Sequence, residues 1–162
     1  MLSEKIKEEI KKLEGPIVVF GAGGFIGANL TRYILEQRKD VYAITSKPFI
    51  PWRLDDIPEN YILHCDITEK NKLEELFQKH AFKTIFDLAA YGAYAKQDIA
   101  EKIYNTNFIG LLNLLETVSK YSIKAFIHAG SSSEYGLNCA GPLEQDELSE
   151  SLPISLNKYI FC

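Results

Sequence analysis

The sequence of 162 residues has few cysteines, little excess charge and no long apolar run. Its three cysteines, Cys65, Cys139 and Cys162, are widely spaced and odd in number, which favours free thiols over a disulfide framework or a zinc site. With 18 Lys and Arg against 22 Asp and Glu, it lacks the basic surface that non-specific nucleic-acid binding needs. No segment approaches the ~20 apolar residues that cross a bilayer, and the first residues lack the apolar core of a signal peptide. We therefore expect a cytoplasmic protein that binds neither nucleic acid nor membranes.

The composition favours a folded domain, because 46% of the residues are hydrophobic, 12% are aromatic and 25% are charged. The first segment, residues 2–13, is predicted to be an amphipathic helix with Ser3 as its N-cap and its charges on the solvated face. We therefore divide the chain into an N-terminal helix at residues 1–15 and one larger domain at residues 16–162. The apolar stripe of the helix consists of Leu2, Ile6, Ile10 and Leu13.

Short apolar runs alternate with helical patterns along the rest of the chain. Continuous apolar strands are typical of a parallel sheet buried on both faces, so the predicted fold class is α/β, doubly wound. Right-handed crossovers and a switch point at the first strand predict the strand order 3-2-1-4-5, with a ligand crevice at the carboxyl ends of the strands. Strands are predicted at residues 17–20, 41–45, 61–65, 84–88 and 125–129, and helices at 25–36, at 69–79 and in a stretch that ends at 121.

Three glycines spaced three residues apart, Gly21, Gly24 and Gly27, stand between the first strand and the first helix of this alternation. The first suits a tight turn, the second lets the backbone approach a pyrophosphate, and the third lets the helix pack closely on the strand. The helix N-terminus then directs its free N–H groups and positive dipole end toward the phosphates. We predict a Rossmann-like dinucleotide site that includes Phe25 and Ile26; the alternative is a glycine-rich turn that binds no ligand.

The end of the second strand bears on the choice between NAD and NADP as cofactor. Thr45, Ser46 and Lys47 stand where a dinucleotide domain usually has a carboxylate for the adenosine ribose. Hydroxyls and a lysine accept a 2′-phosphate that a carboxylate would repel, so these residues favour NADP mildly over NAD. Lys47 is equally compatible with a solvated loop, and Arg53 is a second cation whose place the sequence does not define.

With these glycines, later segments resemble the extended short-chain dehydrogenases, in particular nucleotide-sugar epimerases and dehydratases, over roughly residues 16–159. The resemblance implies that Asp66, with Ile67 beside it, contacts the adenine; an equally weighted alternative is that Asp66 caps the next helix. It also implies that Asn107 helps to organise the active site. The small-residue segment that lies against the cofactor corresponds to Asp87, Leu88, Ala89 and Ala90. The leucines after Asn107 that are predicted to be core are Leu111, Leu112, Leu114 and Leu115.

The segment after the fifth strand resembles the family's serine-rich motif, which ends in Tyr-Gly. The resemblance implies that one serine hydrogen-bonds the reacting hydroxyl or carbonyl of the sugar. Counting back from Tyr135 selects Ser131 as this serine. Aligning forward from the strand selects Ser132 instead, and it places Glu134 where dehydratases keep an acid. We prefer Ser132. The alternative is a polar turn with an N-cap. We predict that His128, inside the strand, is a core histidine with its hydrogen bonds satisfied.

In this family a tyrosine acts as general base or acid, and a lysine four residues later binds the nicotinamide ribose and lowers the pKa of the phenol. Strict spacing from Pro153 places Asn157 and Phe161 at these positions. A two-residue insertion instead selects Tyr159 and puts the lysine one position after the last residue, Cys162. Either way the pair is incomplete, so we expect a domain truncated before the end of the catalytic helix, with the C-terminal substrate domain absent.

The resemblance therefore implies the NAD(P)-binding domain of a nucleotide-sugar epimerase or dehydratase, which acts by hydride transfer at a sugar carbon. Tyr159 would handle the hydroxyl proton, no metal would be needed, and this chain alone would be inactive. The implied partners are a nucleotide-sugar substrate and a second copy of the chain, docked through the helices after the fourth and fifth strands. The alternative hypothesis is a stand-alone, non-catalytic module that binds a dinucleotide or a partner chain.

Overall fold

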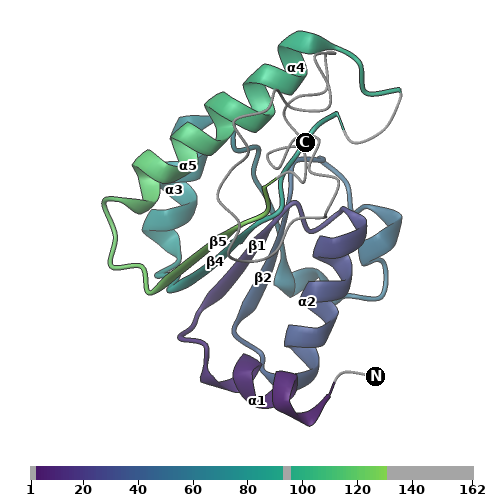
Figure 1. Cartoon of the computed structure of the whole chain (residues 1–162), viewed down its shortest axis with the longest axis vertical. Coiled ribbons are helices and arrows are strands. Elements are labelled where there is room, and N and C mark those ends of the chain that lie inside the picture. Colours follow the sequence, from purple (N-terminus) through teal and green to yellow (C-terminus); the bar gives the residue numbers. More distant parts are fainter. Residues whose placement is uncertain (1–2, 93–95, 131–162) are drawn as a thin grey trace, which may run out of the picture.

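A computed structural model describes residues 3–92 and 96–130 as a parallel five-stranded sheet with helices on both faces (Figure 1). The order of the strands is β3-β2-β1-β4-β5, which confirms the predicted order and fold class. Each strand lies within one residue of its predicted bounds at either end. The strands are β1 (Ile17–Phe20), β2 (Val41–Thr45), β3 (Ile62–His64), β4 (Thr84–Asp87) and β5 (Ala125–His128).

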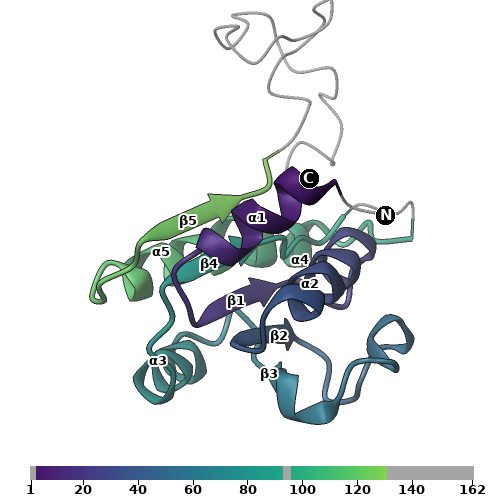
Figure 2. The same ribbon diagram turned by 90° about the horizontal axis from the view of Figure 1, so that it is seen from below.

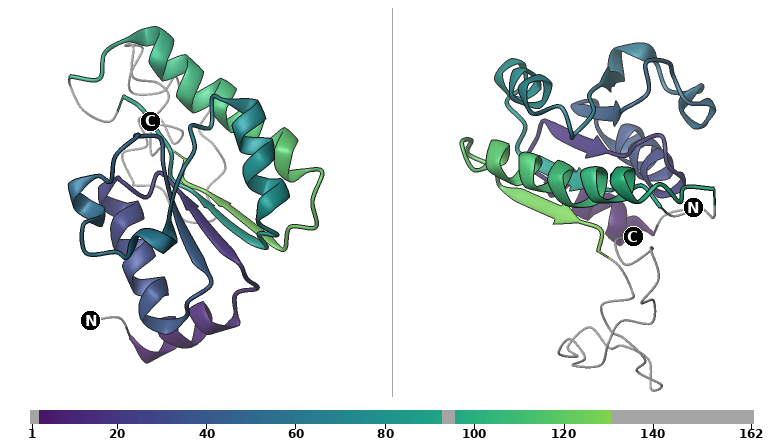
Figure 3. Two further views of the ribbon diagram at one scale, coloured as in Figure 1. Left: turned by 180° about the vertical axis from the view of Figure 1, so that it is seen from behind. Right: turned by 90° about the horizontal axis from the view of Figure 1, so that it is seen from above.

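Alternate residues of the buried strands supply two separate cores. Ile17 and Val19 of β1 pack with α2 (Phe25–Gln37), whereas Val18 and Phe20 pack with α3 (Lys70–Lys79) and α5 (Leu111–Val118). Figure 3 shows α2 on one side of the sheet and α3 and α5 on the other. Because every residue of β1 is buried, this strand has the continuous apolar sequence of a central parallel strand.

The N-terminal helix α1 (Glu4–Lys12) lies across the amino ends of the strands, beside α2 (Figure 2). The predicted N-cap is confirmed, because the Ser3 hydroxyl accepts the N–H of Ile6 at 3.4 Å. Arg38, just after α2, donates from Nη1 to the carbonyls of Ile10 and Leu13 and forms a bidentate ion pair with Asp40. These contacts cover the amino edge of the sheet and leave its carboxyl edge for a site.

The β2–β3 and β4–β5 connections differ in kind. Between β2 and β3 the chain makes two short 3₁₀ turns, η1 (Trp52–Leu54) and η2 (Glu59–Tyr61), and the Arg32–Asp56 ion pair ties this loop to α2. Between β4 and β5 a continuous helical rod consists of α4 (Ala100–Tyr104), a π-helical turn η3 (Asn105–Gly110) and α5. None of the helices within the described ranges is long and apolar enough to span a membrane.

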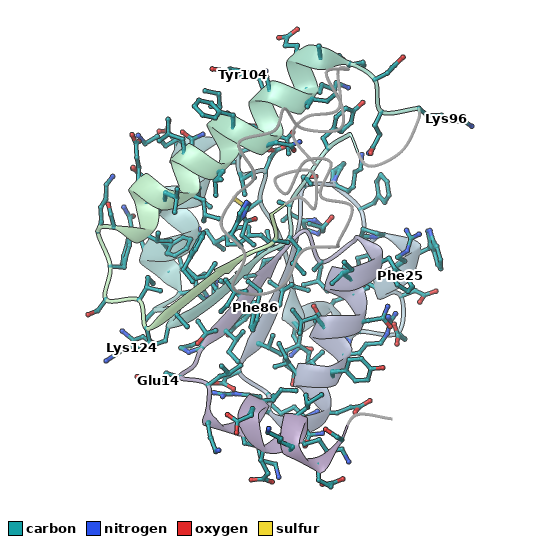
Figure 4. The ribbon with its side chains drawn as sticks, in the orientation of Figure 1. Glu14, Phe25, Phe86, Lys96, Tyr104 and Lys124 are labelled. Carbon is teal, nitrogen blue, oxygen red and sulfur yellow. The ribbon has the colours of Figure 1, made fainter. Side chains whose placement is uncertain are left out.

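One part of the predicted core is wrong. Leu114 is fully buried on the sheet, but Leu112 and Leu115 are each 43% exposed on the outer side of the helical rod. With Tyr104 and Phe108 they form an exposed apolar stripe, and Figure 4 shows Tyr104 on the outer side of α4. A helix turns once in 3.6 residues, so four leucines within five positions cannot all face the sheet.

Candidate functional site

The carboxyl ends of all five strands meet at one edge of the sheet, because all of the strand pairs are parallel. Backbone hydrogen bonds continue past the strands there. The N–H of Ala22 donates to the carbonyl of Ile44, that of Leu88 to Phe20, and that of Ala129 to Asp87, at 3.0 to 3.1 Å. The segments that follow the strands are therefore held next to one another as one surface.

The glycine turn after β1 rests directly on the segment after β4. Gly21 has φ of +70°, which side chains rarely adopt, and a Cβ placed on it would lie 2.4 Å from the carbonyl oxygen of Leu88. The N–H of Gly24 donates to the carbonyl of Gly21 at 2.9 Å and closes the turn. No side chain larger than hydrogen fits at Gly21 without moving the Leu88–Ala89 peptide.

The other two glycines of the motif differ from each other in burial. Gly27 is buried, and a Cβ there would lie 2.4 Å from the carbonyl oxygen of Gly21, so α2 packs against the turn itself. Gly24 is exposed, and a Cβ there would meet that oxygen at a milder 3.2 Å. The structure thus assigns helix packing to Gly27 and leaves Gly24 exposed at the surface.

The N-terminus of α2 can hold an anion. The first N–H groups of a helix have no partner within the helix, and α2 has no acidic residue in its first turn. Phe25 and Ile26 project outward, being 68% and 65% exposed, and Figure 4 shows Phe25 at this end of α2. No side chain caps this end of α2. The turn and helix end therefore fit the pyrophosphate of a dinucleotide.

The residues after β2 lie beside the glycine turn. Thr45 is buried, and its hydroxyl accepts the N–H of Lys47 at 3.2 Å, whereas Ser46 and Lys47 are exposed. A Cβ placed on Gly23 would lie 3.6 Å from the Thr45 hydroxyl oxygen, so this strand end and the turn are neighbours. The guanidinium of Arg53, which the sequence left unplaced, lies 4.3 Å from the ring centroid of Trp52.

The segment after β3 is fixed by two elements. Asp66 Oδ1 accepts from the N–H of Thr68 at 2.9 Å and from its hydroxyl at 2.7 Å. Asp66 does not cap α3, since the N-cap position is Glu69. From α5, Asn113 donates to the carbonyls of Ile67 and Thr68 at 3.2 and 3.3 Å. Ile67 itself is buried in the core under α3 and α5.

The segment after β4 is held from the π-helical turn. Asn107 accepts the N–H of Tyr91 and donates to the carbonyl of Tyr91, both at 2.8 Å, so one side-chain amide fixes one backbone residue from both sides. Leu88 and Ala89 are half-buried, and Ala90 is exposed at the edge. Asn107 therefore orders the loop beside the predicted cofactor segment.

The end of β5 corrects one prediction. His128 is not a core residue, because its side chain is 36% exposed, but it is partnered: Nδ1 lies 2.9 Å from Oδ2 of the buried Asp87. The predicted catalytic residues lie outside the described residues, and they stay predictions. They are Ser131, Ser132, Glu134 and Tyr159.

Sequence reasoning missed two residues of this edge. Asp87 opens the segment that the resemblance places against the cofactor, but the sequence gives its carboxylate no partner, although a carboxylate inside an apolar strand is unusual and signals one. Asn113 stands among leucines, and only its contacts with a segment 45 and 46 residues away show what it does.

Cys65, after β3, is buried, and burial together with the nearby Asp66 charge raises the pKa of its thiol to about 11.

The chain is similar to known proteins in sequence and in fold. The UDP-glucuronate 4-epimerase of Thermodesulfobacterium geofontis is 29% identical over 154 residues, which cover 87% of this chain and 46% of that protein. The dTDP-D-glucose 4,6-dehydratase of Dictyostelium discoideum is 30% identical over 158 residues, covering 88% of this chain and 34% of that protein. A solved structure of an epimerase from Methanothermobacter thermautotrophicus has a TM-score of 0.78 at 27% identity and covers 97% of this chain and 47% of its own.

The chain thus spans less than half the length of each of these proteins. The model of the NAD dependent epimerase/dehydratase family matches residues 17–160, from the first residue of β1 onward. The match includes the glycine turn and every strand end that forms the edge described above. By this match the chain belongs to the NAD dependent epimerase/dehydratase family.

Proposed function

We propose that the chain binds NAD or NADP along the carboxyl edge of the sheet and serves a nucleotide-sugar epimerase or dehydratase reaction. The observation that carries the proposal is the glycine turn. Gly21 and Gly27 are packed too closely for any side chain, while Gly24, the N-cap residue of α2, is exposed and no side chain caps the helix.

The residues of this edge divide the work of binding. The amides at the start of α2 would hold the pyrophosphate, and the ends of β2 and β3, with Ser46 and Asp66, would hold the adenosine. The small residues Ala89 and Ala90 would leave room along β4. When bound, the nicotinamide supplies a hydride acceptor and donor. Ser132 or Ser131 would orient the sugar hydroxyl, and Tyr159 would take or return its proton.

A charge placed at the start of α2 tests the proposal. Phe25→Glu puts a carboxylate beside the first amides of the helix, where it suits the helix dipole but repels a pyrophosphate. We expect this variant to be at least as stable as the wild type in urea and to bind NAD at least about tenfold more weakly in calorimetry. Gln37→Glu, the same charge change at the other end of α2, is the control and should keep wild-type affinity. A wild-type chain that binds neither NAD nor NADP overturns the proposal.

The preference for NADP over NAD is a finer proposal. Its support is the end of β2, where Ser46 and Lys47 are exposed, no carboxylate stands and the buried Thr45 is used within the turn. We expect Lys47→Ala to weaken NADP binding while leaving NAD binding unchanged, because only NADP carries the 2′-phosphate. Equal affinities of the wild type for NAD and NADP would remove this preference and leave dinucleotide binding intact.

The reaction is tested separately from binding. The two curated relatives described above are named for a UDP-sugar epimerisation and a dTDP-sugar dehydration, so we propose a nucleotide-sugar as substrate. Incubation with UDP- and dTDP-sugars, followed by NMR of the products, measures turnover. That the 162 residues alone are inactive is part of this proposal, and product formation would refute it. Dinucleotide binding without turnover is therefore the result that we expect for this chain.

We also propose that a second copy of the chain covers the exposed stripe of the helical rod. Tyr104, Phe108, Leu112 and Leu115 recur at intervals of three or four residues, and the Tyr104 and Phe108 rings stack at 5.3 Å. Sedimentation equilibrium should give a dimer for the wild type and a monomer for Phe108→Glu. A wild-type monomer at high concentration would contradict this proposal.

A further inference from the structure

Asp87, the last residue of β4, has a nearly fully buried side chain at the carboxyl edge, only 1% exposed. All of its acceptor groups are used. Its Oδ1 accepts the N–H of Ala89 at 3.2 Å, its Oδ2 lies 2.9 Å from Nδ1 of His128, and its carbonyl accepts the N–H of Ala129 at 3.0 Å. One residue thus fixes the start of two segments of the site.

A carboxylate is a costly choice for this position. Phe20 and Ile85, which share the same face of the sheet, are buried and apolar. In the part of the chain that the structure describes, the side-chain partner of Asp87 is His128. Burial raises the pKa of the Asp87 carboxyl, and the hydrogen bond from His128 acts against this rise. Since an apolar residue would suit the packing, the acceptor oxygens themselves are what the position requires.

The peptide that Asp87 holds is the one on which the glycine turn rests. A Cβ on Gly21 would lie 2.4 Å from the carbonyl oxygen of Leu88 and 2.7 Å from the nitrogen of Ala89. That same Ala89 nitrogen donates its proton to the Asp87 carboxylate. Rotation of the Leu88–Ala89 peptide would therefore break the bond to Asp87 and displace Gly21 together.

We propose that Asp87 is a positioning residue for the cofactor, which holds the Leu88–Ala89 peptide, and through it the glycine turn, in the geometry that binds the dinucleotide. His128 donates its Nδ1 proton to the carboxylate and keeps it turned toward this peptide. The inference rests on the proposed function, because the ligand of the glycine turn is taken to be NAD or NADP. It adds a residue that touches neither the cofactor nor the sugar.

Two substitutions separate the acceptor oxygens from simple packing. Asp87→Leu fills the space but leaves the N–H of Ala89 and the Nδ1 proton of His128 without an acceptor. We expect it to raise the dissociation constant for NAD by about tenfold or more. Asp87→Asn keeps an oxygen for Ala89 and offers an N–H to His128, which then carries its proton on Nε2. We expect Asp87→Asn to stay within about threefold of wild type, with the tautomer change visible in the ¹⁵N spectrum of His128.

Thr84→Val is the matched control for loss of stability. Thr84 is buried at the opposite end of the same strand, where its hydroxyl donates to the carbonyl of Glu14 at 2.7 Å, far from the cofactor edge. Unfolding in urea and NAD titration are measured for every variant. We expect Thr84→Val to lose stability and keep wild-type affinity.

The outcomes discriminate between the two proposals. If the wild type binds neither NAD nor NADP, the proposed function fails. If the wild type binds NAD and Asp87→Leu binds equally well, or if Thr84→Val loses as much affinity at equal stability, the positioning role of Asp87 is wrong while dinucleotide binding stands. His128→Asn, which retains a donor in place of Nδ1, should bind like the wild type, and His128→Leu should resemble Asp87→Leu.

Discussion

Replacing each of two glycines of the turn by alanine separates a packing role from a ligand-binding role. Gly27 lies inside α2, where alanine is favoured over glycine by about 1 kcal/mol when nothing else changes. Its Cβ, however, would lie 2.4 Å from the Gly21 carbonyl oxygen and 2.8 Å from Cα of Ala22. Both are backbone atoms, so no side chain can turn aside. To restore an ordinary contact, α2 must move away from the turn by about 1 Å.

The cost of that movement exceeds the gain in helix propensity. Overpacking a well-packed site costs roughly 1–3 kcal/mol, and the upper half of this range applies because backbone is displaced. We therefore expect Gly27→Ala to lower the free energy of unfolding by about 1–2 kcal/mol, measured in urea. It should also weaken NAD binding, since the amides of α2 move relative to the turn.

Gly24→Ala is the contrasting case. Gly24 has φ of −76°, which alanine adopts freely, and its Cβ would lie 3.2 Å from a single carbonyl oxygen. We expect a loss of less than about 1 kcal/mol in stability, as for a weaker N-cap, together with loss of NAD binding in calorimetry. Wild-type stability of Gly27→Ala would refute the packing argument. Wild-type affinity of Gly24→Ala would show that the ligand does not approach the backbone there.

Three further predictions concern the edge of the sheet. Because the native pKa of Asp87 is raised, the native state holds this proton more tightly than the unfolded chain. We therefore expect the free energy of unfolding of the wild type, relative to that of Asp87→Asn, to fall as pH rises through that native pKa. Urea titrations from about pH 3 to 7 measure this difference, and a difference that stays constant would contradict the prediction. In a Cys139→Ser/Cys162→Ser variant, the Cys65 thiol is buried and has a pKa of about 11. We expect it to react with iodoacetamide at pH 8 at least about 100-fold more slowly in the folded protein than in the unfolded protein. Equal rates would place the thiol at the surface. Asn107→Ala removes both hydrogen bonds to Tyr91, so we expect it to lower the free energy of unfolding by about 1–3 kcal/mol, measured in urea. An unchanged urea midpoint would mean that other contacts hold the loop at Tyr91.

The sheet could be predicted from the sequence because its strands are local apolar runs and its order follows from the handedness of the crossovers. The helical rod shows where the prediction failed. Its buried residues, Ile103, Gly110, Leu114 and Thr117, are spaced by seven, four and three, which is a regular helical stripe. Leucine identity pointed to Leu112 and Leu115, but helical period selects the stripe that contains a glycine and a threonine.

Other features of the site have no local signal at all. Gly110 packs closely against Ile67, which is 43 positions earlier in the chain. A Cβ on Gly110 would lie 2.6 Å from Cγ1 of Ile67. The pairing of Asp87 with His128 arises from the register of β4 and β5, which sets these two residues side by side. A sequence pattern that treats each segment separately describes neither contact, so it predicts a core histidine where the structure has a half-exposed one paired with Asp87.

Asp66 does not cap α3, but the local turn that holds its side chain is compatible with the adenine contact that we propose. Its Oδ1 takes both hydrogen bonds from Thr68, and within the described ranges Oδ2 accepts none. The first oxygen fixes the orientation of the carboxylate, and the second stays available at the edge of the sheet. Asn113 and Gly110 hold the same segment from the helical rod, so the carboxylate stands on a backbone that is fixed from both sides. A side chain that a local turn holds in place is better prepared for a ligand, because binding then costs less conformational entropy.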